Sequence, residues 1–253
     1  MNSDMSSEAV IRKFEELSLN SWPALRSLYY DGWLIRTSGG YTMRSNSVWP
    51  LYRSSLDTNE KINTCETYYR SFKQPPIFRI ASIDGTTPLD SLLERRGYTV
   101  NSPTSVQILD ITSESFAPDK SVTLDTVPTE NWVAGFTHLA QITPERSLLY
   151  RSIIDTIAVP ACYVSIILDS RLVAFGQGVL DRGFIGIYGM FTHRSYRRRG
   201  LARKLLVSML AWAQGRGATA SYLHVEKDNS PAIALYTDLG FREIYRYHYR
   251  VGA

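Results

Sequence analysis

The sequence predicts an α/β protein, with a mixed sheet of the α+β type, that is built as two similar lobes. Strand-like and helix-like segments alternate along the chain, which is typical of mixed folds. The two halves also match each other: when Gly97 is aligned with Gly240, 143 positions later, Ile62 falls opposite Leu205 without a gap. We therefore expect two lobes, each with a mixed, mostly antiparallel sheet flanked by helices.

The first half reads as a helix, two strands, a helix, a strand, a short helix and a strand. The expected bounds are residues 8–17, 28–37, 41–49, 59–72, 77–82, 89–95 and 105–111. Ser6 or Ser7 is suited to cap the first helix, and Pro75-Pro76 stops the second. The small residues Ser38-Gly39-Gly40 predict a hairpin turn between the first two strands.

The polar residues 112–120 carry Pro118 and have no apolar period, so we expect a linker between lobes of residues 1–111 and 121–253. The second half then reads as a strand, two helices, three strands, a helix and a strand. The expected bounds are residues 121–125, 130–140, 144–157, 162–168, 171–180, 184–192, 201–214 and 220–225. Asp169-Ser170 predicts a hairpin turn between the first two of the three strands.

A basic, glycine-containing loop leads from the strand 184–192 into the helix 201–214. It reads Arg-Arg-Arg-Gly-Leu-Ala from Arg197 to Ala202. Small residues let the backbone approach a ligand, and the amides and positive dipole end of a helix start favour an anion. Arg194, Arg203 and Lys204 add positive charge nearby. This concentration of charge at one site favours a polyphosphate ligand over a nucleic-acid duplex.

A second motif begins about thirty residues further on. It runs from Asn229 to Phe241 as Asn-Ser-Pro-Ala-Ile-Ala-Leu-Tyr-Thr-Asp-Leu-Gly-Phe. In this order and spacing, the two motifs resemble the hallmark motifs of the Gcn5-related N-acetyltransferase (GNAT) superfamily, over the chain from about Val122 to its end. The resemblance implies acetyl-CoA as the acyl donor and an amine as the acceptor, without saying which amine.

The internal alignment predicts that only the second lobe is active. Opposite Arg197, Gly200, Ala202 and Tyr236 stand Ser54, Asp57, Asn59 and Leu93. An aspartate at the phosphate-facing glycine repels a pyrophosphate, and a leucine has no proton to give. The first lobe is therefore expected to be a degenerate GNAT-like lobe that has kept the packing pattern and lost the chemistry.

The resemblance assigns donor-binding roles to two stretches and two further residues. The candidates are Met190, Phe191, Thr192, Arg197, Arg198, Arg199, Gly200, Leu201, Ala202, Arg203, Asn229 and Tyr236. The strand 190–192 would pair with the pantetheine arm and offer its amides to the oxyanion. Asn229 would also cap the following helix. Tyr236 stands at the family's position for a general acid, where a phenol protonates the leaving thiolate.

No carboxylate occupies the strand 183–189, where many members of the superfamily carry a glutamate base. Glu226 and His224, which point to one face of a strand, are the nearest titratable candidates, and Tyr188 is suited to order a water molecule. An amine that arrives already deprotonated needs no dedicated base. The sequence leaves these alternatives open.

Several aromatic and polar residues of the first lobe have two readings. Trp33, Trp49, Tyr41 and Tyr69 either line a cleft between the lobes or, the reading we favour, pack in the core. Arg44 and Asn46, expected on the strand before Trp49, are candidates to meet a polar substrate across that cleft.

Composition bears on metal sites, on the cellular location and on the partners of the protein. The formal net charge is +4, and Cys65 and Cys162 have no metal-type neighbours, so we expect buried thiols and no metal site. No apolar run has the length of a transmembrane helix, and the N-terminus is polar. These observations predict a cytoplasmic monomer or homodimer with no nucleic-acid or membrane partner.

The function expected from these residues is transfer of an acetyl group from acetyl-CoA to a primary amine of a small polar molecule, such as an antibiotic or an amine metabolite, with Tyr236 as general acid. A protein lysine or N-terminal amine is the alternative acceptor. A module that senses acyl-CoA without catalysis is the alternative of a different class.

Overall fold

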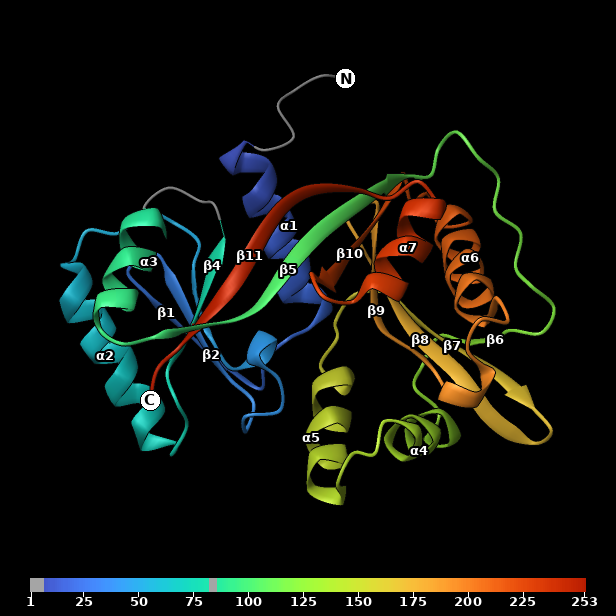
Figure 1. Cartoon of the computed structure of the whole chain (residues 1–253), viewed down its shortest axis with the longest axis horizontal. Helices are drawn as coiled ribbons and strands as arrows, with labels where there is room; N and C mark the ends of the chain where they lie inside the picture. The colour runs from blue at the N-terminus through green and yellow to red at the C-terminus, as the bar shows by residue number, and fades with distance from the viewer. Residues whose placement is uncertain (1–6, 82–85) are drawn as a thin grey trace. The chain divides into compact units, whose positions relative to one another are not determined.

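The computed structural model describes residues 7–81 and 86–253. They form two compact units, which we describe separately (Figure 1). Unit 1 runs to Val106 and also contains Val225–Asn229 and Glu243–Ala253. Unit 2 contains Gln107–His224 and Ser230–Arg242. Three strands, named below, therefore divide between the units.

Unit 1 carries the elements of the first half together with the last strand of the chain. Its helices are α1 (Glu8–Ser21), α2 (Thr58–Ser71) and α3 (Thr86–Arg95), with a short 3-10 turn, η1 (Met43–Ser45). Its strands are β1 (Arg26–Tyr30), β2 (Trp33–Thr37), β3 (Val48–Pro50), β4 (Ile77–Ala81), most of β5 (Thr99–Asp110) and β11 (Arg242–Val251). They lie in the order β1-β2-β3-β4-β11-β5. The predicted mixed sheet is confirmed, because β3 and β4 are parallel whereas β11 is antiparallel to β4.

The first predicted strand is wrong in one respect: it is a hairpin. Asp31 and Gly32 have φ of 42° and 80°, so the chain reverses there and β1 pairs antiparallel with β2. The Asp-Gly pair is a strong signal for this type of turn. A Cβ at Gly32 would also lie 2.4 Å from the carbonyl oxygen of Arg53, so only glycine fits. The apolar and aromatic residues before Asp31 continue the strand-like pattern of the residues after Gly32, so the turn between them was not predicted.

The second predicted strand, 41–49, is mostly a loop, and only Val48–Pro50 pair as a strand. The side chain of Asn46 builds this loop, because its Oδ1 accepts hydrogen bonds from the amides of Ser38 and Gly40 at 2.7 and 2.8 Å. Arg44 lies in η1 rather than on a strand. The proposed substrate contact of Asn46 is therefore replaced by a structural role within unit 1.

The four aromatic residues of the first half with two possible roles belong to the core. Trp33, Tyr41, Trp49 and Tyr69 are all buried, and Trp33 and Tyr69 share one hydrophobic cluster. The Tyr69 hydroxyl donates a hydrogen bond to the backbone carbonyl of Arg36 at 2.7 Å. The core interpretation of these four residues is confirmed.

A buried ion pair joins α1 to the sheet of unit 1. The guanidinium of Arg79 donates to both carboxylate oxygens of Glu15 at 2.5 Å, and Tyr245 donates to the same carboxylate at 2.6 Å. Arg79 also lies 4.1 Å from the centre of the Trp49 ring. Burial disfavours the charge of Arg79, but Glu15 and the neighbouring tyrosines outweigh it and raise the arginine pKa.

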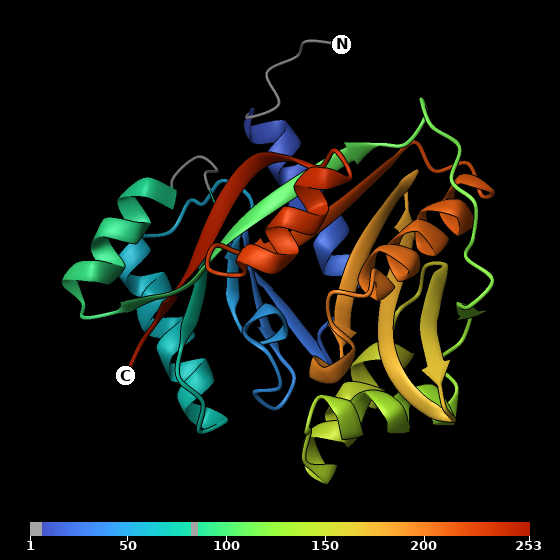
Figure 2. The same cartoon turned by 45° about the vertical axis from the view of Figure 1, so that its right-hand side comes forward.

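Unit 2 carries most elements of the second half, including the helices that contain the two motifs. Its helices are α4 (Glu130–Leu139), α5 (Pro144–Asp155), α6 (Leu201–Gln214) and α7 (Ser230–Asp238), with a 3-10 turn, η2 (Arg194–Tyr196). Its strands are β6 (Thr123–Asp125), β7 (Ala161–Leu168), β8 (Arg171–Asp181), β9 (Phe184–Thr192) and most of β10 (Ala220–Glu226), in the order β10-β9-β8-β7-β6. The predicted hairpin at Asp169-Ser170 is confirmed by their φ of 50° and 60°. Helix α6 and the pair α4 and α5 lie on opposite sides of these strands (Figure 2).

The internal repeat is confirmed by the bounds of the elements. Moved by 143 positions, α2 falls on residues 201–214, which are the bounds of α6. The last residue of α3, Arg95, falls on Asp238, the last residue of α7, and the first residue of β5, Thr99, falls on Arg242, the first residue of β11. The two halves are thus tandem copies of one arrangement.

The last strands of the two copies extend beyond the half to which they belong. From Glu243 onward β11 is part of unit 1, where Val251 pairs with Ile77. In the other direction, β5 enters unit 2 from Gln107, and the amide of Ile111 donates to the carbonyl of Thr219 at 3.0 Å. The compact units therefore differ from the expected ranges 1–111 and 121–253, because strand pairing here is long-range.

Residues 112–120 form neither helix nor strand, as predicted, and run along α6 in unit 2. The side chain of Gln214 donates to the carbonyls of Ile111 and Glu114 and accepts from the amide of Phe116. Further along, the amide of Asp119 donates to the hydroxyl of Ser208 at 3.0 Å. These hydrogen bonds hold the segment against the helix.

An ionic cluster holds β11 against α3, and we expect it to make stability depend on pH. Arg250 Nε donates to Asp90 Oδ1 at 2.7 Å, and His248 Nε2 lies 2.9 Å from the same oxygen. Burial raises the pKa of Asp90, but Arg250 and His248 outweigh it and hold that pKa below its usual value. We expect Asp90→Asn to lower the free energy of unfolding at pH 7. The difference should shrink as the pH falls below about 4, where the unfolded carboxyl is protonated.

Urea unfolding of both proteins between pH 3 and pH 7 measures this effect. The exposed Asp228→Asn is the control, and it should leave stability unchanged across that range. A difference for Asp90→Asn that grew toward low pH would contradict the assignment.

The two cysteines, Cys65 and Cys162, are free and buried as expected, and burial raises the pKa of each thiol to about 12. Within residues 7–81 and 86–253, no helix is both long and apolar enough to cross a membrane.

Candidate active site

The strand β9 separates from β10 halfway along its length. The two strands pair in parallel from Phe184, opposite Ala220, to Ile187, opposite Leu223, and β9 then continues to Thr192. A bulge follows the last pair, where the register between β8 and β9 shifts, and Gly189 adopts φ of 58°. A bulge re-aims the backbone beside it, so the end of β9 presents main-chain groups away from the ladder.

The basic loop ends in an uncapped helix start. Gly200 is the N-cap of α6, has φ of 74°, and supplies no side-chain hydrogen bond to the first turn. An added Cβ would meet nothing within 4 Å, so the backbone conformation alone favours glycine. Arg198 is also left-handed, with φ of 62°. The first-turn amides, which include those of Leu201 and Ala202, are therefore available to an anion.

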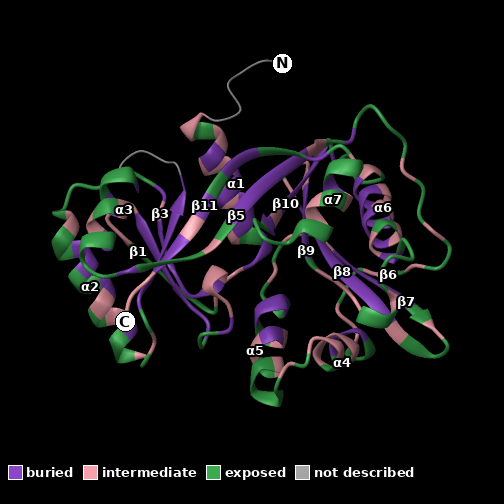
Figure 3. Ribbon diagram, in the orientation of Figure 1, coloured by how far each residue is buried: buried purple, intermediate pink, exposed green. Residues whose placement is uncertain are grey.

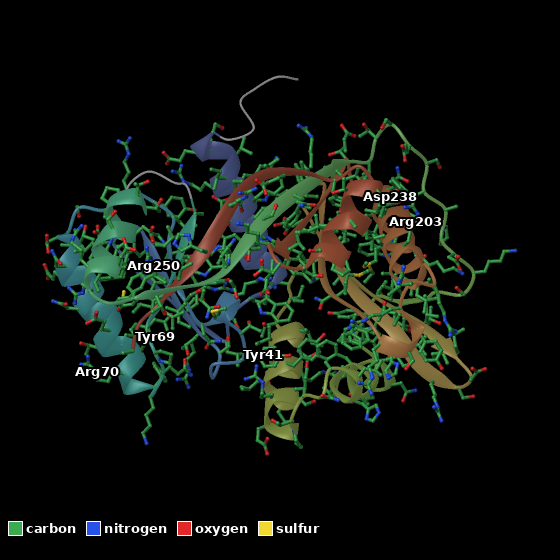
Figure 4. All side chains as sticks on the ribbon, viewed as in Figure 1. Tyr41, Tyr69, Arg70, Arg203, Asp238 and Arg250 are labelled. Carbon is green, nitrogen blue, oxygen red and sulfur yellow. The ribbon has the colours of Figure 1, made fainter. Side chains whose placement is uncertain are left out.

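Two of the predicted cations are engaged in ion pairs within unit 2. Arg203 Nη1 donates to Asp238 on α7 at 2.5 Å, and both side chains extend outward from neighbouring helices (Figure 4). Lys204 lies 3.3 Å from the carboxylate of Asp119. The expected contribution of Arg203 to charge is thus partly neutralised. Arg197 folds back and donates to the carbonyl of Thr192 at 3.2 Å, so it shapes the loop.

The three predicted residues of β9 face different surroundings. A Cβ at Gly176 would lie 2.5 Å from the sulfur of Met190, so this side chain packs toward α6. Phe191 stacks on Phe175 with ring centres 5.2 Å apart, on the face covered by α4. The hydroxyl oxygen of Thr192 is buried and has no hydrogen-bond partner among the described residues. A ligand beside the end of β9 would satisfy it.

Tyr236 lies on α7 and is 7% exposed. The centre of its ring is 5.8 Å from the centre of the Phe241 ring. Burial raises the pKa of Tyr236 to about 12. At neutral pH the phenol therefore keeps its proton, which is the form that a proton donor needs. The motif residues Gly240 and Phe241 close the helix, because the amide of Phe241 donates to the carbonyl of Tyr236 at 3.0 Å.

Tyr188 belongs to a polar cluster where β9 and β10 stop pairing. Its hydroxyl lies 3.0 Å from that of Tyr222, and its ring stacks on His224 with ring centres 6.2 Å apart. Gly186 makes room for the pair, since a Cβ there would lie 2.7 Å from both tyrosine rings. The sequence singled out Tyr188 and His224 but missed Tyr222, for which alternation along β10 with His224 was the available signal.

Glu226 and Asn229 belong to unit 1, whereas the other candidates belong to unit 2. Glu226 is exposed at the end of β10, and its carbonyl accepts a hydrogen bond from the amide of Asn229 at 3.0 Å. Helix α7 begins at Ser230, directly after Asn229, as the motif predicts. The roles of both residues stay predictions.

The corresponding helix start in the first copy is capped by a carboxylate of the chain, and a second carboxylate binds the loop before it. Asp57 caps α2, accepting from the amides of Asn59 and Glu60 at 3.0 and 3.1 Å. In the loop before this helix, the amide of Leu56 donates to the carboxylate of Asp31, in the turn between β1 and β2, at 2.9 Å, and backbone hydrogen bonds hold the pKa of this carboxyl well below its usual value. The two helix starts thus differ in the same direction as the predicted loss of phosphate binding from the first copy.

These features fit the phosphate and amide groups of acetyl-CoA. An uncapped helix start with glycine at its N-cap suits a pyrophosphate, and the end of β9 with its buried Thr192 hydroxyl suits an amide-bearing chain. Within residues 7–81 and 86–253, no group of three or more His, Cys, Asp or Glu is placed to hold a metal ion.

Known proteins resemble this chain over nearly its whole length. A family model described as "Probable histone acetyltransferase Rv0428c C-terminal" matches residues 8–250. A Bacillus subtilis protein described as "Uncharacterized N-acetyltransferase YobR" is 27% identical over 244 residues, which cover 95% of this chain and 98% of that protein.

Solved structures share the fold at low sequence identity. A GCN5-related N-acetyltransferase from Kribbella flavida superposes with a TM-score of 0.69 and 15% identity, covering 96% of this chain and 95% of its own. A tandem GNAT protein from the clavulanic acid biosynthesis pathway gives a TM-score of 0.62 and 13% identity, covering 81% of this chain and 74% of its own.

Proposed function

Since the chain belongs to the acetyltransferase family of the Rv0428c C-terminal model and is a GNAT-type N-acetyltransferase, we propose that its second copy transfers an acetyl group from acetyl-CoA directly to a primary amine. The single observation that carries this proposal is the contrast between the two helix starts. That of α6 has no side-chain cap, whereas that of α2 is capped by Asp57.

In this proposal the loop 197–203 holds the pyrophosphate of acetyl-CoA, chiefly through the amides at the start of α6. The residues Met190, Phe191 and Thr192 run beside the pantetheine arm, and their amides stabilise the developing oxyanion. Asn229 contributes from the start of α7. When bound, acetyl-CoA supplies an activated acyl group on sulfur.

Side chains of the protein then donate and accept the protons of the reaction. The amine nitrogen forms a bond to the acyl carbon while the bond from that carbon to sulfur breaks. Tyr236 donates its proton to the departing thiolate and recovers one from solvent, and the amine loses one proton in exchange. Glu226 and Tyr188 remain the candidates for accepting that proton, the latter through water.

The proposed acceptor is a small polar amine. The description of the matching family favours a second candidate, a protein amine, because it names a histone acetyltransferase. A panel of amino sugars, polyamines, amino-acid amides, peptides with free N-termini and lysine-containing peptides distinguishes the two, with thiol release from acetyl-CoA as the signal. Release with no member of the panel, together with binding of acetyl-CoA, would instead support the sensing module. A cytoplasmic location and the oligomeric state stay predictions from the sequence.

We expect Gly200→Asp to weaken acetyl-CoA binding at least tenfold. The carboxylate repels the pyrophosphate and competes for the first-turn amides, and the left-handed backbone adds strain. Calorimetric titration with coenzyme A measures the loss.

The matched control is Gly217→Asp, beyond the other end of α6. Gly217 also has positive φ, 80°, and open space around an added Cβ, so it shares the strain without the ligand. Equal weakening by both substitutions would show that the effect comes from folding rather than from the phosphate site.

A further inference from the structure

Gln177 is a buried amide in the middle of unit 2. It lies on β8 and is 1% exposed. Neither its Oε1 nor its Nε2 has a hydrogen-bond partner among the described residues. Figure 3 shows most of β8 as buried. A buried amide without partners costs more than an ordinary hydrogen bond contributes, so such a group in a folded protein calls for a partner, either a bound water molecule or a ligand.

The side chain of Gln177 points to the face of the sheet covered by α4. Its neighbour Gly176 faces α6, because a Cβ there would lie 3.4 Å from Met209. Successive side chains of a strand alternate, so Gln177 shares the face of Phe175, whose ring packs against Trp132 of α4 with ring centres 5.8 Å apart.

On that face Gln177 lies between two tyrosines. It pairs in register with Tyr163 of β7 on one side and with Tyr188 of β9 on the other. Side chains that pair in register stand about 5 Å apart. Tyr188 begins the cluster with Tyr222 and is followed directly by the bulge at Gly189. The unsatisfied amide thus stands beside the middle of β9, two residues before Met190, where the proposed oxyanion amides begin.

We propose that Gln177 binds the amine acceptor through a neutral group that both donates and accepts a hydrogen bond, an amide or a hydroxyl, next to the amine. Nε2 donates to this group and Oε1 accepts from it, so both orphaned atoms are satisfied at once. This inference rests on the proposed function and narrows its substrate class: the acceptor is an amino amide or an amino alcohol rather than a hydrocarbon amine.

The first test needs no acceptor and uses the thermal midpoint of the full chain. We expect Gln177→Met to raise it by about 2 °C or more, because an apolar side chain of similar length removes two unsatisfied atoms. The control is Gln214→Met. This glutamine's amide bonds Ile111, Glu114 and Phe116, so its loss should lower the midpoint. An unchanged or lower midpoint for Gln177→Met would overturn the inference, since it would mean that the amide already has a partner.

The second test compares matched acceptors in the thiol-release assay. Alaninamide and alaninol are each set against the hydrocarbon amine of the same shape, and kcat/KM is measured for both members of a pair. We expect the wild type to prefer the polar member at least tenfold more strongly than Gln177→Met does, chiefly through KM, with the affinity for acetyl-CoA unchanged.

Equal preference in the two proteins would overturn the inference while leaving the proposed function intact. Absence of thiol release with every amine of the wider panel would instead count against the proposed function, and the thermal midpoint would then decide the role of Gln177 by itself.

Discussion

Tyr236→Phe is expected to lower kcat for amine-dependent thiol release by about 100-fold or more while leaving the affinity for acetyl-CoA within about twofold. The phenol is buried on α7, and burial raises its pKa to about 12. It therefore holds its proton up to about pH 11. At any pH below that value, we expect no decrease in wild-type activity from loss of this proton. Removing the hydroxyl leaves the ring to pack against Phe241 and takes away the proton for the thiolate.

The measurement is single-turnover thiol release, with calorimetric titration of coenzyme A beside it. Tyr98→Phe is the control, because Tyr98 is also buried with a raised pKa but lies in unit 1, where its hydroxyl donates to Glu66 at 3.0 Å. It should keep the wild-type rate. An unchanged rate for Tyr236→Phe would remove this residue as the general acid.

Glu15→Gln is expected to destabilise the protein by about 3–5 kcal/mol, because it leaves the guanidinium of Arg79 buried without a countercharge. Arg79 and Glu15 are both nearly inaccessible and joined by two hydrogen bonds of 2.5 Å. The glutamine side chain keeps the shape of glutamate and one hydrogen-bond acceptor. The loss of stability therefore measures the removal of the charge more than a change in packing. Urea unfolding at pH 7 measures the change.

Arg246→Met serves as the control for an exposed pair. Arg246 lies 2.8 Å from Glu243 but is 68% exposed, so its loss should cost about 1 kcal/mol or less. The double variant Glu15→Leu with Arg79→Met should recover part of the stability lost in Glu15→Gln, because no unpaired charge remains. A cost for Glu15→Gln as small as that of the control would contradict the buried pair.

Much of the fold was predictable because its signals are local. The bounds of β9 and α6 were predicted without error, since an apolar run and a helical period of adequate length are bounded there by turn residues. The repeat was predictable for the same reason, because the packing faces of α2 and α6 preserve one period. The hairpin at Asp31-Gly32 was missed although its turn signal is strong, since the flanking residues read as one continuous strand.

The candidate site was only partly predictable. Motifs gave Gly200 and Tyr236 by residue type and spacing. The ion pair between Arg203 and Asp238 joins α6 to α7, and no period or motif predicts such a contact. Likewise, Gln177 is an ordinary polar residue in a strand until its burial and its unpartnered amide are known.

The sequence by itself predicted the family, an acetyl-CoA donor and the difference between the two copies, because each prediction depends on residues close together in the chain: a helix start with glycine or aspartate, and a tyrosine or a leucine at the position of the proposed acid. Only the tertiary structure decided where the last strands pair, which cations are neutralised and which buried polar groups have no partner. Those properties depend on contacts between segments far apart in sequence, and burial sets the energy of each polar group only after the chain has folded.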